Sequence, residues 1–174
     1  MRKVEVVSHD PQWQGMFIAE SNQVAEALSK NFVAVHHIGS TAIPQIFAKP
    51  IIDLLIEVKD ITQVDERNRA MELLGYKGMG EFGIPGRRYF RKDNSEGIRT
   101  HHTHIFTLGS DQVKRHLAFR DYMTAHPEDA QSYSELKRSL AKKYPTDVDS
   151  YMDGKDSFIR EIDQKAAQWQ AKYK

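Results

Sequence analysis

The stretch from His36 to Val58, HHIGSTAIPQIFAKPIIDLLIEV, places one carboxylate inside an apolar run. A first apolar segment ends at Gly39-Ser40, and a loop with two prolines leads to a second segment that contains Asp53. An isolated carboxylate is costly to bury unless a partner compensates its charge. Asp53 is therefore expected either to form a structural ion pair, with Lys49 or an arginine of a following strand, or to belong to a functional site.

Apolar periodicity along the chain predicts an α+β fold. Residues 32–38 and 51–58 are expected to be strands, the second covered on both faces because its apolar residues hardly alternate with polar ones. The same patterns predict further strands over 76–79, 87–92 and 98–108, and helices over 11–30, 61–74, 113–125, 127–144 and 147–172.

Composition excludes several classes of site and partner. The 174 residues carry a formal net charge of +1 and no cysteine. Disulfides, thiolate metal sites and a cysteine nucleophile are therefore excluded, and no nucleic-acid or membrane partner is expected. The first residues lack the apolar segment of a secretory signal, and the longest apolar stretch is too short to cross a bilayer. We therefore expect a cytoplasmic location.

A histidine-rich segment, RTHHTH from Arg99 to His104, lies in the last predicted strand. In a strand, His102 and His104 share one face at about 7 Å between Cα atoms, which lets both imidazoles reach one ion. Together with Asp53 they would form a set of two histidines and one carboxylate. The alternative is a polar strand that faces solvent.

Two further segments suggest phosphate binding. Gly39-Ser40 follows a strand end, where backbone N–H groups and a hydroxyl can hold a phosphate oxygen, although a plain turn also explains the pair. The segment GRRYFRK, Gly86 to Lys92, places Arg88 and Phe90 on one strand face and Arg87, Tyr89 and Arg91 on the other. Arginine forks suit phosphate groups, but a solvated strand face is the alternative. The candidate phosphate ligands are Gly39, Ser40, Lys49, Arg87, Arg88 and Arg99.

Taken together, several motifs resemble the GrpB family. They are DPQW near the start, HHIGSTAIP followed by KPIIDLLIEV, then LLGY, GIPGRRYFRK and RTHHTHIF, and finally LAFRDYMTAHPEDAQSYSELKRSLAKKY. The resemblance covers almost the whole chain, and related domains occur fused to dephospho-CoA kinase. It implies a nucleotidyltransferase (polymerase-β-like) fold with a mixed or antiparallel sheet, helices packed on it and a helical C-terminal part. It also implies a single GrpB-like domain over 1–174, with the helix-plus-sheet core in 1–109 and C-terminal helices in 110–174.

The resemblance gives Asp53 a role, with one departure from the expected pattern. Nucleotidyltransferases place Gly-Ser or Gly-Gly about a dozen residues before a pair of acids that hold Mg²⁺ ions. Gly39, Ser40 and Asp53 match this pattern, but Leu55 occupies the position of the second acid. Glu57 lies on the same strand face, but about 13 Å from Asp53 between Cα atoms, so it cannot substitute for that acid.

The leading hypothesis is a protein that binds a nucleotide or phosphorylated small molecule with a single divalent metal, Mn, Zn or Mg. Asp53 would be the catalytic residue if the protein is a transferase, and Asp53, His102 and His104 would be the metal ligands. One alternative is a metal-dependent hydrolase or lyase that acts on a small molecule. Another is a non-catalytic interaction module with a relic pocket. The sequence makes no prediction of oligomeric state.

Overall fold

The computed structural model describes residues 3–173, so residues 1, 2 and 174 of the predicted single domain lie outside the described residues. Within this range the chain forms two compact units. The sheet unit comprises residues 11–38 and 51–114. The helical unit comprises residues 3–10, 39–50 and 115–173.

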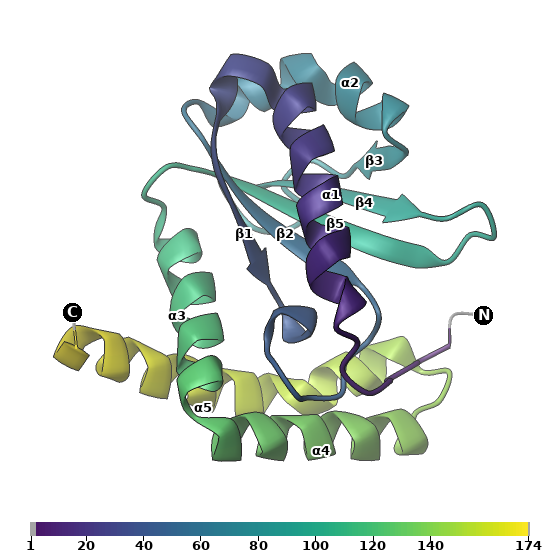
Figure 1. The fold of residues 1–174 in the computed structure, drawn as a ribbon, viewed down its shortest axis with the longest axis vertical. Helices are drawn as coiled ribbons and strands as arrows, with labels where there is room; N and C mark the ends of the chain where they lie inside the picture. The colour runs from purple at the N-terminus through teal and green to yellow at the C-terminus, as the bar shows by residue number, and fades with distance from the viewer. Residues whose placement is uncertain (1–2, 174) are drawn as a thin grey trace. The chain divides into compact units, whose positions relative to one another are not determined.

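The sheet unit contains one five-stranded sheet in the order β1-β2-β5-β4-β3 (Figure 1). Strands β2 and β5 are parallel, and all other neighbours are antiparallel, so the sheet is mixed. Central strand β2 is apolar on both faces, and Leu54, Leu55 and Ile56 are fully buried. The strands are β1 (Phe32–Ile38), β2 (Ile52–Val58), β3 (Tyr76–Gly78), β4 (Arg88–Asp93) and β5 (Arg99–Thr107).

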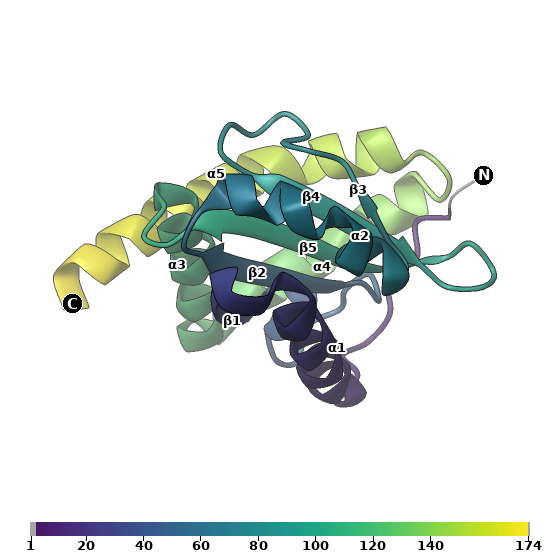
Figure 2. The same ribbon diagram turned by 90° about the horizontal axis from the view of Figure 1, so that it is seen from above.

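Two helices lie on one face of this sheet, as Figures 1 and 2 show together. Helix α1 (Gln12–Leu28) contacts β1 and β2, and the short helix α2 (Asn68–Leu73) contacts β3. The buried side of α1 includes an acid, Glu20, which accepts hydrogen bonds from the Tyr76 hydroxyl at 2.7 Å and from Lys92 Nζ at 2.8 Å. This face of the sheet is therefore closed by apolar packing and by one buried ionic network.

The α-helix predicted over residues 61–74 is wrong in its first half. Residues Ile61–Arg67 form a 3₁₀-helix, and α2 begins only at Asn68. The Asp60 side chain accepts hydrogen bonds from both the backbone N–H and the hydroxyl of Thr62, at 2.9 and 2.7 Å. Three of the first four residues of this segment are β-branched, which also lowers helix propensity. The local hydrogen bonds therefore favour the tighter turn.

The helical unit contains most of α3 (Asp111–Ala125), together with α4 (Pro127–Lys143) and α5 (Val148–Tyr173). Segment 39–50 belongs to this unit and includes a 3₁₀ turn over Ser40–Ala42. The three helices confirm the predictions for this part of the chain to within a few residues. Their largest shared core consists of buried apolar side chains: Ile43, Ile46, Ala118, Tyr122, Met123, Ala130, Tyr133, Ile162 and Ala166.

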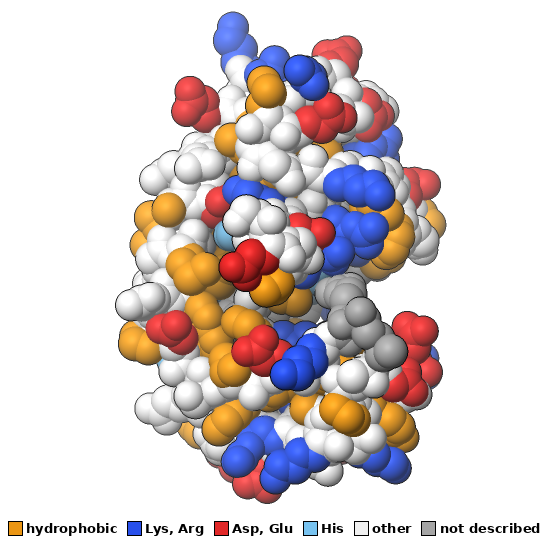
Figure 3. Space-filling view, turned by 90° about the vertical axis from the view of Figure 1, so that its right-hand side faces the viewer, with side chains coloured by type: hydrophobic (Ala, Val, Ile, Leu, Met, Phe, Trp, Pro, Cys, Tyr) orange, Lys and Arg blue, Asp and Glu red, His pale blue; other side chains and the backbone are white. Residues whose placement is uncertain are grey.

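The apolarity of the helices and the charge of the surface relate to the predictions about membrane and nucleic-acid partners. No helix within residues 3–173 combines the length and apolarity that a bilayer span requires. On the face drawn in Figure 3, Lys and Arg side chains are interspersed with Asp and Glu side chains. That face carries charges of both signs, whereas phosphate backbones of nucleic acids favour continuous basic surfaces.

Candidate functional site

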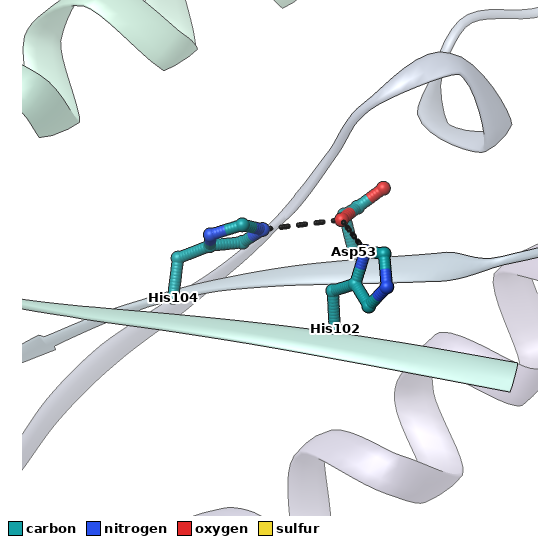
Figure 4. A group of neighbouring side chains, drawn as sticks. All are labelled: Asp53, His102 and His104. Carbon is teal, nitrogen blue, oxygen red and sulfur yellow. Dashed lines mark hydrogen bonds and ion pairs between the residues drawn. The ribbon is translucent and has the colours of Figure 1, made fainter. Parts of the chain in front are cut away.

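The register of β2 against β5 brings the three candidate metal ligands together. Asp53 pairs with His102, and Leu55 pairs with His104. Paired residues of neighbouring strands project to the same face, and so do residues two apart on one strand. Asp53, His102 and His104 therefore point to one face of the sheet and converge, as Figure 4 shows.

Both imidazoles contact the same carboxylate oxygen. His104 Nε2 lies 3.1 Å from Asp53 Oδ1, and His102 Nδ1 lies 3.4 Å from that atom. Burial raises the pKa of Asp53, but the hydrogen bonds from His102 and His104 and their electrostatic effect outweigh it and hold the pKa well below its usual range. Two histidines of the neighbouring strand thus compensate the carboxylate inside the apolar strand.

The geometry of this cluster fits a single divalent ion. One ligand atom from each residue can be chosen so that all three lie within 4.8 Å of one another. Ligand atoms about 2.1 Å from one ion are separated by about 3.0 Å at right angles and about 3.4 Å in a tetrahedron. Two of the three separations, 3.1 and 3.4 Å, have this size, which is also that of a hydrogen bond. The role of the three residues as metal ligands remains a prediction.

The outer nitrogen of each imidazole faces an arginine. Arg87 Nη1 lies 3.3 Å from His104 Nδ1, and Arg99 Nη1 lies 3.4 Å from His102 Nε2. A guanidinium can only donate, so each outer nitrogen accepts, and each inner nitrogen carries its proton toward Asp53. An ion at the inner nitrogens would move these protons outward, where metal-bound histidines usually meet an acceptor. Metal binding therefore requires both arginines to turn away.

Arg87 and Arg99 are thus brought to the candidate site. Arg87 is buried, donates to the carbonyl oxygens of Glu81 and Phe82 at 3.2 and 3.0 Å, and has its pKa lowered by burial. Arg99 also pairs with Asp93 at 2.5 Å. Each guanidinium group lies beside one imidazole and carries several N–H donors, which suit an anion.

Arg88 is not brought to this site. It alternates with Arg87 along β4 and therefore lies on the opposite face, where its Nε contacts Asp65 Oδ1 at 2.8 Å. The ion pair lines a small cavity of about 120 Å³ together with Asn68, Glu72 and other residues near β3. The sequence predicted that Arg87 and Arg88 face opposite ways, but not which of them faces Asp53.

The other three candidate phosphate ligands, Gly39, Ser40 and Lys49, belong to the helical unit. Gly39 has φ +75°, a left-handed conformation that favours glycine, and it precedes the turn that starts at Ser40. Lys49 Nζ lies 4.7 Å from the centroid of the Tyr151 ring. The joint action of these residues with Asp53 remains a prediction.

Tyr89 is a site residue that the sequence reasoning left out. Its ring centroid lies 5.6 Å from that of His102 and 5.4 Å from that of His104. The Arg87 guanidinium carbon lies 4.9 Å from the same ring. The signal was present in the alternation of Arg87, Tyr89 and Arg91, which puts the tyrosine on the same face as the arginine. Tyr89 packs against both imidazoles and restricts their orientation.

The second acid of the nucleotidyltransferase pattern is absent from β2. The residue two positions after Asp53 is Leu55, which is fully buried, and not a carboxylate. Glu57 is engaged elsewhere: its Oε2 lies 2.9 Å from His36 Nε2, and its Oε1 accepts a hydrogen bond from Gly109 N at 3.4 Å. This strand therefore supplies one site carboxylate, not two.

Solved structures resemble this chain at two levels. The crystal structure of GrpB from Enterococcus faecalis matches with a TM-score of 0.91 and 42% identity, over 95% of this chain and 99% of that one. Terminal uridylyl transferase 4 from Trypanosoma brucei, solved with bound dUTP, matches with a TM-score of 0.56 and 11% identity, over 94% of this chain and 56% of that one. Cid1 matches with a TM-score of 0.53. The chain has the nucleotidyltransferase fold, as its resemblance implied.

Relatives identified by sequence include longer proteins. UPF0157 protein YqkA from Bacillus subtilis is 42% identical over 168 residues, which are 97% of this chain but 48% of YqkA. A dephospho-CoA kinase from Mycolicibacterium paratuberculosis is 25% identical over 95% of this chain and 46% of its own length. The chain thus spans about half the length of these two proteins. The model of the GrpB protein family matches residues 3–165, and the chain therefore belongs to the GrpB family.

Proposed function

We propose that this protein binds one divalent cation at Asp53, His102 and His104 and, beside it, a nucleotide or phosphorylated small molecule. The observation that carries the proposal is the convergence of three ligand atoms from two neighbouring strands within 4.8 Å. Two imidazoles and one carboxylate favour Mn²⁺ or Zn²⁺ over Mg²⁺. When bound, such an ion would polarise a phosphoryl oxygen or activate a water molecule.

The arginines support a phosphorylated ligand. Arg87 and Arg99 flank the two imidazoles, and each presents guanidinium N–H groups on the side away from Asp53. An ion at Asp53 would free both arginines from the outer nitrogens, and their donors would then suit phosphate oxygens. Gly39, Ser40 and Lys49, in the helical unit, are also proposed as phosphate ligands. The nucleotidyltransferase fold favours a nucleotide among phosphorylated compounds.

The missing second acid limits the chemistry. Two-metal nucleotidyl transfer stabilises the attacking and the leaving oxygen with separate ions, which requires at least two carboxylates. Because Leu55 stands where the second acid would be, we expect at most one tightly bound divalent ion per chain and slow or no ordinary nucleotidyl transfer. A hydrolase or lyase that uses one ion to activate water remains compatible with the same ligands.

One observation favours a second candidate, an anion-binding module without metal. Both outer nitrogens face arginines, so each imidazole can donate its inner proton to Asp53 in a closed hydrogen-bonded array. In that case Arg87 and Arg99 alone would bind the anion. The two candidates differ in one measurable respect, the affinity for a divalent ion.

Isothermal titration calorimetry with MnCl₂, ZnCl₂ and MgCl₂ tests the proposal on the full chain. We expect one site per chain, with Mn²⁺ or Zn²⁺ bound more tightly than Mg²⁺, and a loss of affinity of at least about tenfold in His104→Ala. His116→Ala, a histidine outside the cluster, is the matched control and should bind like the wild type. Absence of binding would favour the metal-free module, and two Mg²⁺ ions per chain would refute the assignment.

A ligand screen then identifies the reaction class. Nucleotides, coenzyme A and phosphorylated metabolites are tested for a rise in melting temperature, with and without Mn²⁺, because a ligand that binds only the native state stabilises it by mass action. Ligands that raise the melting temperature are then assayed for hydrolysis and for transfer to an acceptor. Shifts that require Mn²⁺ in the wild type and vanish in Asp53→Asn would support a shared metal and phosphate site.

A further inference from the structure

Two tyrosine–lysine pairs lie in the core of the helical unit. The sequences YSELK in α4 and YMDGK in α5 place Lys137 one turn after Tyr133, and Lys155 one turn after Tyr151. Each Nζ lies over the ring of its own tyrosine, 4.5 Å from the centroid for Lys137 and 4.8 Å for Lys155. Lys137 is 1% exposed and Lys155 is 9% exposed. Two lysines on two packed helices are thus withdrawn from water.

A third lysine approaches the same tyrosine from segment 39–50. Lys49 Nζ lies 4.7 Å from the Tyr151 centroid. Tyr151 is therefore contacted by two ammonium groups, one from its own helix and one from a segment about a hundred residues earlier in the chain. Tyr151 itself is fully buried. The cluster brings three lysine side chains around two buried rings.

Two polar groups of this cluster are buried without a partner. Within residues 3–173, neither Lys137 Nζ nor the Tyr151 hydroxyl has a hydrogen-bond partner. A buried donor without an acceptor destabilises the native state, and a buried charge without a counter-ion does so more strongly. Burial and the nearby Lys155 accordingly lower the pKa of Lys137 to about 6. Contact with the Tyr133 ring does not give Lys137 Nζ the oxygen acceptor that its protons need.

We infer that Lys49, Lys137 and Lys155, with the Tyr151 hydroxyl, bind a phosphate group whose oxygens supply the acceptors that Lys137 Nζ and the Tyr151 hydroxyl lack. A phosphoryl or diphosphate group carries two or more negative charges on several oxygens and can accept from several of these side chains at once, whereas a carboxylate offers two oxygens and one charge. Lysine serves as a point-charge ligand for phosphate on a flexible stem, which lets the three side chains reorient around the anion. The inference deepens the proposed function and rests on it for the choice of phosphate.

The test measures inorganic pyrophosphate binding to the full chain by calorimetry and by melting temperature, at constant ionic strength. We expect saturable binding to the wild type that weakens at least about tenfold in Lys137→Met. Lys142→Met makes the same substitution at an exposed position of α4 and should bind like the wild type. Without anion, Lys137→Met should melt at or above the wild-type temperature, because a thioether chain replaces an unpaired buried amine.

Further variants keep the test decisive. Tyr151→Phe removes only the hydroxyl and should weaken pyrophosphate binding if Lys137→Met fails to fold. Lys137→Met should bind Mn²⁺ like the wild type while its pyrophosphate response is lost, which separates this inference from the proposed metal site. Binding of nucleoside triphosphates is compared with binding of pyrophosphate, because tighter binding of the triphosphates would identify the phosphates of a nucleotide, rather than a free anion, as the ligand. The inference is overturned if the wild type shows no saturable response, or if Lys137→Met and Tyr151→Phe bind as tightly as Lys142→Met.

Discussion

Replacing Glu20 by glutamine tests whether charge holds α1 on the sheet. Glu20 is 6% exposed and accepts from the Tyr76 hydroxyl at 2.7 Å and from Lys92 Nζ at 2.8 Å, with His101 Nε2 at 3.7 Å. Breaking a buried ion pair by removing one partner costs about 3–5 kcal/mol. Glutamine keeps the shape and one acceptor for Tyr76, and Lys92 retains partial access to water. We therefore expect Glu20→Gln to lower the free energy of unfolding by about 2–3 kcal/mol at pH 7.

The pH dependence of this loss has a definite sign. Burial raises the pKa of Glu20, but the hydrogen bonds from Lys92 and Tyr76 and the charge of His101 lower it below its usual range. A carboxyl whose pKa is lower in the folded state stabilises the protein fully above its unfolded pKa, about 4.3, and loses that contribution as the pH falls through the folded value. The difference between wild type and Glu20→Gln should therefore be constant from about pH 6 to 8 and shrink below about pH 4.

Urea denaturation at pH 7 and at pH 3.5 measures both quantities. Lys92→Met gives a second estimate of the same ion pair, and the double variant gives the coupling between the two residues. An equal loss of stability at both pH values would refute the argument, because it would show that the charge of Glu20 does not contribute. A loss of unfolding free energy below about 0.5 kcal/mol at pH 7 would also refute the argument, because exposed ion pairs on protein surfaces contribute as much as that.

Three further predictions follow from other contacts. Arg99→Gln should tighten Mn²⁺ binding about tenfold, because the amide oxygen can accept a proton from the outer nitrogen of His102; weaker binding in calorimetry would contradict this. Gly154→Ala should destabilise the protein by about 1 kcal/mol despite better helix propensity, because its Cβ would lie 2.5 Å from Leu140 Cδ2; in a Leu140→Ala background the same change should become stabilising in thermal unfolding. Asn31→Ala should lower the free energy of unfolding by about 2–3 kcal/mol, because the buried amide forms two hydrogen bonds with the backbone of Asp60. An unchanged midpoint in urea denaturation would exclude that role.

Local patterns in the sequence were sufficient to predict the strands and most of the helices. The apolar run around Asp53 predicted a buried central strand, and β2 is buried apart from Asp53 itself, which is partly exposed. The i, i+2 spacing placed His102 and His104 on one face, as strand geometry requires. The 3₁₀-helix at Ile61–Arg67 was missed because its apolar spacing resembles that of an α-helix, and the side-chain hydrogen bonds of Asp60 decide between the two.

The assembly of the site depends on long-range information that the sequence does not display. His104 and Asp53 are 51 positions apart, and their contact depends on the register of two parallel strands. The register of β4 against β5 decides that Arg87, and not Arg88, faces the cluster. The arginines at the outer nitrogens also depend on side-chain orientations that no spacing rule specifies. The buried state of Lys137 was likewise not predictable, because lysine at a helical position is usually exposed.

The parallel pairing of β2 with β5 also has a consequence for folding kinetics. Strands this far apart in sequence can pair only after a long loop has closed, and non-local pairings of this kind form slowly. An ion held by Asp53 and His104 would link the two ends of that loop. It would bind only chains in which β2 and β5 are paired in the native register. The time at which metal affinity appears during refolding would then report when β2 and β5 pair.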